Sequence, residues 1–124
     1  MSGHTVLIVE DEKSLRDAIR DKLTRSGVVV LEAEDGAQGL QVALAKQPDL
    51  ILLDILIPKM DGIEMLRQLR ADDRGKTIQV ILLTNLNDIN RLDEALTLGA
   101  RDYLIKSDIK LEDLVKAIQD RIGV

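Results

Sequence analysis

The sequence predicts an α/β fold: a doubly wound, five-stranded parallel sheet with helices on both faces, in a single domain. Strand-like and helix-like segments alternate five times along the chain, as they do in folds of this class. The strand-like runs are short and apolar without period-two alternation, which is expected of strands covered on both faces. With 124 residues, 45% of them hydrophobic, the chain is long enough to bury a core without disulfides.

The five expected strands are short apolar runs. They cover about residues 5–9, 28–33, 50–54, 79–83 and 102–105. Because Phe and Trp are absent and Tyr103 is the sole aromatic residue, the core must be built from Leu, Ile, Val and Ala.

Two amphipathic helices are expected between the first three strands. The first covers about residues 14–25, where Ser14-x-x-Asp17 resembles a capping box and Gly27 is placed to end the helix. The second covers about residues 37–46 and stops before Pro48. Their apolar faces comprise Leu15, Ala18, Ile19 and Leu23 in the first, and Leu40, Ala43 and Leu44 in the second.

Three further helices are expected in the second half of the chain. They cover about residues 63–71, 88–98 and 110–122, and Gly99 bounds the middle one. The last has the clearest apolar stripe, formed by Leu111, Leu114, Val115, Ile118 and Ile122.

Right-handed crossovers between parallel strands leave few arrangements, and we expect the flavodoxin-like strand order 2-1-3-4-5. In such sheets ligands bind beyond the carboxyl ends of the strands, where the order reverses beside the first strand. Glu10, Asp11 and Asp54 fall at that place. We expect residues 1–4 to be an N-terminal tail or a cloning remnant, and residues 5–124 to be the domain.

Composition excludes several classes of function. The absence of cysteine excludes disulfides, iron–sulfur clusters and thiolate zinc sites. Without a secretory signal or a membrane-length apolar stretch, we expect a cytoplasmic protein that does not enter a membrane. The net charge of −5 argues against nucleic acid as a direct partner, although an acidic surface also simply favours solubility.

Charged residues at the strand ends indicate a phosphoryl and metal site. Asp54 ends an apolar run, where burial of an unpaired charge is costly, so a cation or a donor must lie nearby. Glu10 and Asp11 follow the first strand, and Lys106 follows the fifth. Carboxylates about 4 Å apart repel by about 4 kcal/mol at an effective dielectric constant of about 20. A divalent cation would balance the three acids and the lysine.

Five motifs in order resemble a response-regulator receiver domain, the phospho-accepting module of two-component signalling, over about residues 5–122. No single motif is specific, but all five at these spacings are. They are Val9-Glu10-Asp11-Glu12, Pro48-Asp49-Leu50-Ile51-Leu52-Leu53-Asp54, Pro58-Lys59-Met60-Asp61-Gly62, Thr84, and Gly99-Ala100-Arg101-Asp102-Tyr103-Leu104-Ile105-Lys106.

The resemblance implies that Asp54 is the nucleophile, which takes a phosphoryl group as an acyl phosphate. It implies that Mg²⁺ is held by Glu10, Asp11, Asp54 and the backbone carbonyl of Leu56. It further implies that Lys106 pairs with Asp54 and then with the phosphoryl oxygens.

The resemblance also implies a switch. Thr84 would donate a hydrogen bond to a phosphoryl oxygen, and Tyr103, at the position of the family's switching aromatic, would turn inward as the threonine moves. A tyrosine packed on a neighbouring helix is the alternative interpretation of Tyr103.

Three features depart from the family's commonest pattern. Ser107 follows Lys106 where proline in a cis peptide is usual, so we expect a trans bond or local strain there. Asn85 replaces a small residue beside Thr84. Leu56 and Leu86 stand where polar residues often tune hydrolysis, and because they cannot orient water we expect a long-lived phosphoryl state.

The leading hypothesis is a single-domain response regulator that catalyses its own phosphorylation and dephosphorylation. Its donor would be a histidine kinase, a phosphotransfer protein or acetyl phosphate. Its output would be a contact with a downstream protein through the fourth helix, fifth strand and fifth helix, where Ile89, Leu92 and Leu96 are candidates for exposed apolar residues. A phosphorylation-dependent homodimer through that face is a further option.

Three alternatives stay open. One is a receiver-like interaction module without a phosphoryl cycle, which Ser107 and Asn85 keep in view. A phosphatase with an aspartate nucleophile would usually carry a second acid where this chain has Leu56. A flavin-binding protein would need a Ser/Thr/Gly-rich loop after the first strand, where this chain has acidic residues.

Overall fold

The computed structural model describes residues 3–85, 91–100 and 102–123. Its strands are β1 (Thr5–Val9), β2 (Val29–Ala33), β3 (Leu50–Asp54), β4 (Gln79–Thr84) and β5 (Asp102–Ile105). Its helices are α1 (Lys13–Arg25), α2 (Gly36–Lys46), α3 (Gly62–Ala71), the 3-10 turn η1 (Asp73–Gly75), α4 (Leu92–Thr97) and α5 (Leu111–Ile122).

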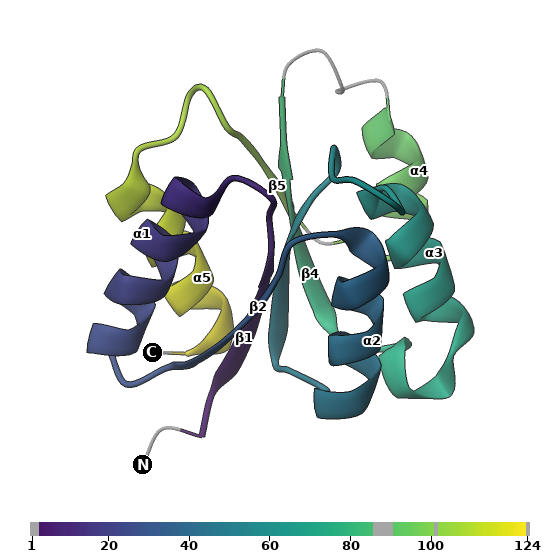
Figure 1. The fold of residues 1–124 in the computed structure, drawn as a ribbon, viewed down its shortest axis with the longest axis horizontal. Coiled ribbons are helices and arrows are strands. Elements are labelled where there is room, and N and C mark those ends of the chain that lie inside the picture. Colours follow the sequence, from purple (N-terminus) through teal and green to yellow (C-terminus); the bar gives the residue numbers. More distant parts are fainter. Residues whose placement is uncertain (1–2, 86–90, 101, 124) are drawn as a thin grey trace.

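The sheet is five-stranded and parallel, in the order β2-β1-β3-β4-β5, which confirms the predicted fold class and strand order. Figure 1 shows α1 and α5 on one face of the sheet and α2, α3 and α4 on the other. Among the described residues, no helix combines the length and the apolar character that a membrane span needs.

The core lies in two layers, because successive residues of each strand point to opposite faces. Val6 and Ile8 of β1 pack in the layer beneath α1 and α5, whereas Leu7 and Val9 pack beneath α2 and α3. The strand β3 is buried along its whole length. This burial on both faces explains why the sequence of β3 shows no polar alternation.

Two helices begin at aspartate caps. The side chain of Asp35 accepts a hydrogen bond from Gln38 N at 2.7 Å, and that of Asp61 accepts one from Glu64 N at 3.0 Å. Such caps satisfy backbone N–H groups that have no partner within the helix. They fix the starts of α2 and α3 close to the carboxyl edge of the sheet (Figure 1).

The predicted capping box of the first helix is wrong. Ser14 lies inside α1, the N-cap residue is Glu12, and no side chain caps this end. The Asp17 carboxylate instead pairs with Lys13, one turn earlier. The predicted fourth helix began at residue 88, but residues 88–90 lie outside the described ranges, and the helix ends at Thr97 just before Gly99.

Candidate functional site

Four neighbouring strands bring the predicted site residues to one edge of the sheet. Val9 is in register with Leu53, Asp54 with Leu83, and Thr84 with Ile105. Glu10, Asp54, Thr84 and Lys106 therefore all lie at the carboxyl ends of adjacent parallel strands. This edge is where sheets of this topology bind ligands.

Asp54 is buried, with a side chain that is only 2% exposed, and both of its carboxylate oxygens have donors. Oδ2 accepts from Lys106 Nζ at 2.9 Å, and Oδ1 accepts from the backbone N–H of Leu56 at 3.1 Å. Burial raises the pKa of Asp54 above its ordinary value, although these donors oppose the shift. The partners make a buried carboxylate tolerable.

Lys106 connects two of the acids. Its ammonium lies 2.8 Å from Glu10 Oε1 as well as 2.9 Å from Asp54 Oδ2. Burial alone would lower the pKa of Lys106, but the two carboxylates outweigh it and hold that pKa above its ordinary value. Lys106 is placed by its own backbone N–H, which donates to Thr84 O at 2.7 Å. The Lys106–Ser107 peptide is trans, so Lys106 reaches Asp54 without the usual cis bond.

The three acids form a cluster with the character of a cation site. Glu10, Asp11 and Asp54 each offer a carboxylate oxygen, and these oxygens lie within 4.8 Å of one another. Glu10 and Asp54 are buried, whereas Asp11 is exposed. Burial raises the pKa of Glu10 to about 7. An oxygen cluster that is open to water on one side suits Mg²⁺, which keeps several waters when it binds proteins.

One atom supports this fit independently. Glu10 Oε1 is buried and, among the described residues, makes no hydrogen bond of good geometry, although the charge of Lys106 is close. The other oxygen, Oε2, accepts from Glu12 N at 2.8 Å. Buried acceptors normally have a partner, so Oε1 keeps the capacity to bind a cation.

Among the described residues, the side chains of the two predicted switch residues make no hydrogen bond to the acids or to the Lys106 ammonium. Thr84 is fully buried, and its Oγ1 donates to the carbonyl of its neighbour Asn85 at 3.1 Å. The Tyr103 side chain on β5 is 42% exposed, so it is not packed inward. Leu56 donates its N–H to Asp54 and exposes half of its side chain, while Leu86 lies outside the described residues.

The sequence analysis did not predict the contacts of two residues, Arg16 and Asp61, near the site. Arg16 of α1 is buried and donates to the backbone carbonyl of Glu10 at 2.7 Å. Its position three residues before Ile19, on the apolar face of the helix, was a signal that could have found it. Asp61, which was named only as part of a motif, both caps α3 and pairs with Arg91, its Oδ2 lying 3.0 Å from Arg91 Nη2.

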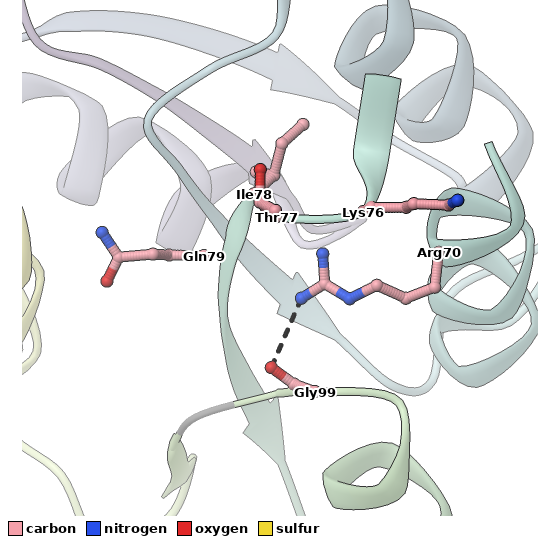
Figure 2. A pocket seen from close by; sticks show the side chains of 6 residues that line it. All are labelled: Arg70, Lys76, Thr77, Ile78, Gln79 and Gly99. Carbon is pink, nitrogen blue, oxygen red and sulfur yellow. Dashed lines mark hydrogen bonds between the residues drawn. The ribbon is translucent and has the colours of Figure 1, made fainter. Parts of the chain in front are cut away.

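A separate cleft on the described part of the structure contains none of the predicted site residues. It is lined by Arg70, Lys76, Thr77, Ile78, Gln79 and Gly99. Because Gln79 begins β4 and Thr84 ends it, the cleft lies at the opposite end of the strand from the acids. The Arg70 guanidinium in Figure 2 is occupied by backbone carbonyls, including Leu98 O at 2.7 Å and Gly99 O at 3.3 Å. The arginine therefore fastens the chain after α4 to α3.

Comparison with known proteins identifies the class to which this fold and site belong. The family model of the response regulator receiver domain matches residues 6–119. The chain therefore belongs to the response regulator receiver domain family, the receiver module of two-component response regulators.

Individual relatives support this assignment. The chain is 38% identical over 125 residues to the phosphate regulon transcriptional regulatory protein PhoB of Pseudomonas aeruginosa, covering 99% of this chain and 55% of PhoB. It is 41% identical over 101 residues to the transcriptional regulatory protein CusR of Escherichia coli, covering 82% of this chain and 44% of CusR. The chain thus spans about half the length of the curated relatives it matches.

Solved structures agree. The receiver domain of the sensor histidine kinase PA1611 from Pseudomonas aeruginosa, which has a magnesium ion coordinated in its active-site cleft, is 31% identical with a TM-score of 0.84. That match covers 98% of this chain and 99% of the other. The chemotaxis protein CheY4 of Vibrio cholerae is 29% identical with a TM-score of 0.84, covering 94% and 97% of the two chains.

Proposed function

We propose that this domain accepts a phosphoryl group on Asp54 in a Mg²⁺-dependent reaction. The donor would be the phosphohistidine of a histidine kinase or a phosphotransfer protein, or a small acyl phosphate such as acetyl phosphate. The observation that carries the proposal is the buried Asp54 carboxylate, which is 2.9 Å from Lys106 and clustered with two further acids at the ligand-binding edge. Membership of the receiver family supports it.

In the proposed step, a carboxylate oxygen of Asp54 bonds to the phosphorus of the donor. The bond from phosphorus to the donor's nitrogen or oxygen breaks, and its electron pair leaves with the imidazole or the acetate. Lys106 would then donate to a phosphoryl oxygen. Mg²⁺, held by Glu10, Asp11, Asp54 and the carbonyl of Leu56, would neutralise negative charge on the transferring group. Hydrolysis by water would return Asp54 and inorganic phosphate.

The proposed output is a change of the surface formed by α4, β5 and α5. Thr84 would turn from the Asn85 carbonyl toward the phosphoryl group, and the exposed ring of Tyr103 would move inward behind it. The new surface would bind a downstream protein or a second copy of the domain.

Sedimentation with and without beryllofluoride, an analogue of the phosphoryl group, tests the homodimer. If the protein stays monomeric with beryllofluoride, the homodimer is excluded and the downstream protein is the output partner.

We also propose a long-lived phosphoryl state. The Leu56 side chain is 50% exposed beside Asp54 and has no group that could orient an attacking water. A Leu56→Asn variant should lose its phosphoryl group several-fold faster than the wild type. The matched control is Val29→Asn, which changes an equally exposed apolar residue on β2. Fast loss from the wild type, unaffected by Leu56→Asn, would count against this proposal.

Intact mass spectrometry after incubation with acetyl phosphate and Mg²⁺ tests the phosphoryl step. The wild type should gain the mass of one phosphoryl group, and Asp54→Asn should gain none. Asp49→Asn is the control, because Asp49 lies on the same chain segment but binds Thr5 N at the far end of β3. Tyr103 emission during titration with Mg²⁺ and then beryllofluoride gives a second measurement.

The same experiments separate the alternative. A receiver-like interaction module without a phosphoryl cycle would show neither the added mass nor a response to beryllofluoride. The contact between Lys106 and Asp54, made despite Ser107, favours the phosphoryl cycle over this module.

A further inference from the structure

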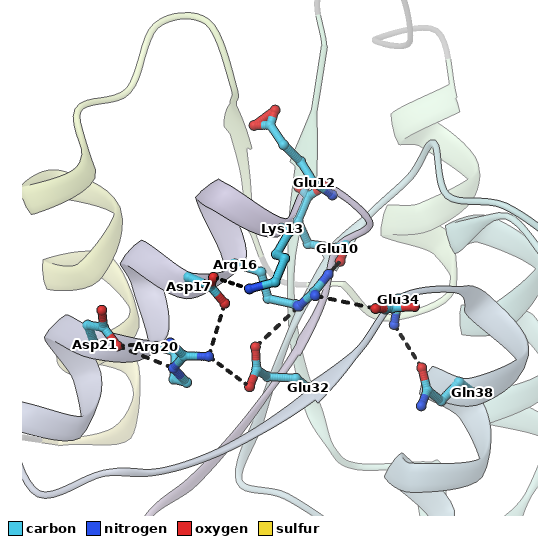
Figure 3. A network of polar contacts seen from close by, with 10 residues as sticks. All are labelled: Glu10, Glu12, Lys13, Arg16, Asp17, Arg20, Asp21, Glu32, Glu34 and Gln38. Carbon is cyan, nitrogen blue, oxygen red and sulfur yellow. Dashed lines mark hydrogen bonds and ion pairs between the residues drawn. The ribbon is translucent and has the colours of Figure 1, made fainter.

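Arg16 links helix α1 to the ends of β1 and β2. Its side chain is only 7% exposed and points toward the strands, where the guanidinium meets three acceptors (Figure 3). Nη1 donates to Glu10 O at 2.7 Å, Nε donates to Glu32 Oε1 at 3.2 Å, and Nη2 lies 3.5 Å from Glu34 Oε1. All three nitrogens of the planar guanidinium thus face an acceptor, and the single ammonium of a lysine could not reproduce this arrangement.

These contacts matter because they help to hold the backbone of Glu10 in place. Its N–H donates to Ala33 O at 3.0 Å, and its carbonyl accepts from Arg16. Its carboxylate accepts from Glu12 N through Oε2 and lies 2.8 Å from Lys106 through Oε1. A fixed backbone sets the direction in which the Glu10 side chain leaves the chain, and the contacts of Oε2 and Oε1 then set where its carboxylate points.

We propose that Arg16 is a positioning residue for the metal site: by holding the Glu10 carbonyl and the acids at the end of β2, it orients the Glu10 carboxylate toward the cation. This inference rests on the proposed function, because it assumes that Glu10 binds Mg²⁺. Among the described residues, Arg16 makes no hydrogen bond or ion pair with the carboxylates of Glu10, Asp11 or Asp54. Groups that orient metal ligands in this way influence affinity without contacting the metal.

The next turn of the same helix supplies a matched control. Arg20 pairs with Asp17, Asp21 and Glu32, so it carries the same charge and has similar partners (Figure 3). It makes no hydrogen bond or ion pair with Glu10 among the described residues. Removing either arginine changes the net charge equally, but only Arg16→Gln releases the Glu10 carbonyl.

The experiment is calorimetric titration of metal-free protein with Mg²⁺, repeated by electron paramagnetic resonance with Mn²⁺, for wild type, Arg16→Gln, Arg16→Lys and Arg20→Gln. We expect the dissociation constant of Arg16→Gln to rise about tenfold, as is typical when a partner of a metal ligand is removed. Arg16→Lys should recover part of the affinity, and Arg20→Gln should keep the wild-type value. In phosphorylation assays, Arg16→Gln should need more Mg²⁺ but approach the wild-type rate at saturation.

The outcomes separate this inference from the proposed function. If the wild type binds no Mg²⁺, the proposed function fails. If the wild type binds it and a folded Arg16→Gln binds it equally well, or if Arg20→Gln weakens binding as much, the positioning role is overturned. Should Arg16→Gln fail to fold, Arg16→Lys decides, because a lysine keeps the charge but cannot reach all three acceptors of the guanidinium. Weaker Mg²⁺ binding by Arg16→Lys than by Arg20→Lys supports the inference, and equal binding by these two variants overturns it.

Discussion

Replacement of Lys106 by methionine should destabilise the metal-free domain. The Lys106 ammonium lies 2.8 Å from Glu10 Oε1 and 2.9 Å from Asp54 Oδ2, so its loss leaves two buried carboxylates whose oxygens lie within 4.8 Å. At an effective dielectric constant of about 20, their repulsion is about 3 kcal/mol. Breaking a buried ion pair typically costs about 3–5 kcal/mol. We therefore expect Lys106→Met to lower the free energy of unfolding by about 3 kcal/mol at alkaline pH, where Glu10 is ionised.

Urea denaturation followed by circular dichroism in the presence of a chelator measures this loss. Lys116→Met is the control, because Lys116 pairs with Asp120 on an exposed helix face, where such pairs contribute about 0.3–0.5 kcal/mol. Added Mg²⁺ should restore part of the stability of Lys106→Met, since the cation takes over the charge that the ammonium supplied. If Lys106→Met lost no more stability than Lys116→Met in the metal-free protein, the account of the site as two mutually repelling acids held by one lysine would be refuted.

Three further predictions concern the same edge of the sheet. Because burial raises the pKa of Glu10 from 4.5 to about 7, the folded metal-free protein binds a proton more tightly than the unfolded chain. Its free energy of unfolding should therefore fall as the pH rises through this range, by up to about 3 kcal/mol from Glu10 alone. In urea titrations, Glu10→Gln should remove this contribution and leave only that of Asp54, whose pKa is also raised. Mg²⁺ affinity, measured by calorimetry, should weaken as the pH falls below about 7, since a proton and the metal compete for Glu10. Gly36→Ala should lower the melting temperature far more than Gly39→Ala. A Cβ at position 36 would lie 1.8 Å from the Met60 carbonyl oxygen, which belongs to the backbone, whereas a Cβ at position 39 would lie 3.0 Å from side-chain atoms, which can shift.

The sequence was sufficient to predict the architecture because the three central strands, β1, β3 and β4, are buried on both faces. Continuous apolar runs separated by amphipathic segments permit few arrangements, and β1, β3 and β5 have the predicted bounds. The start of α1 was wrong because the helix is set by backbone contacts after the acidic turn: Arg16 N donates to Glu12 O at 3.0 Å, and no side chain caps the helix. A short local motif such as Ser14-x-x-Asp17 cannot reveal that Lys13 takes the Asp17 carboxylate.

The acids and Lys106 could be placed together because topology alone brings the carboxyl ends of parallel strands to one edge. Contacts that depend on how helices pack could not be predicted. The pair between Asp61 and Arg91 joins residues 30 positions apart and depends on α4 lying beside α3. Arg16 could have been suspected from its place among apolar residues, but its contact with the site is to the backbone carbonyl of Glu10, and every residue type has such a carbonyl.

Under the proposed function, the supply of hydrogen-bond donors explains why Thr84 must move. A phosphoryl group brings three strongly accepting oxygens to the site. The charge it adds would be balanced by a divalent cation, but its oxygens would also need donors. The donors that the structure places on Asp54 are Lys106 Nζ and the N–H of Leu56, and Lys106 is shared with Glu10. The hydroxyl of Thr84, at the end of the adjacent strand β4, already donates its hydrogen bond to the Asn85 carbonyl. Exchanging that neutral acceptor for a charged phosphoryl oxygen would gain a stronger hydrogen bond. In the proposed switch, this gain would supply free energy for the change in the surface of α4, β5 and α5.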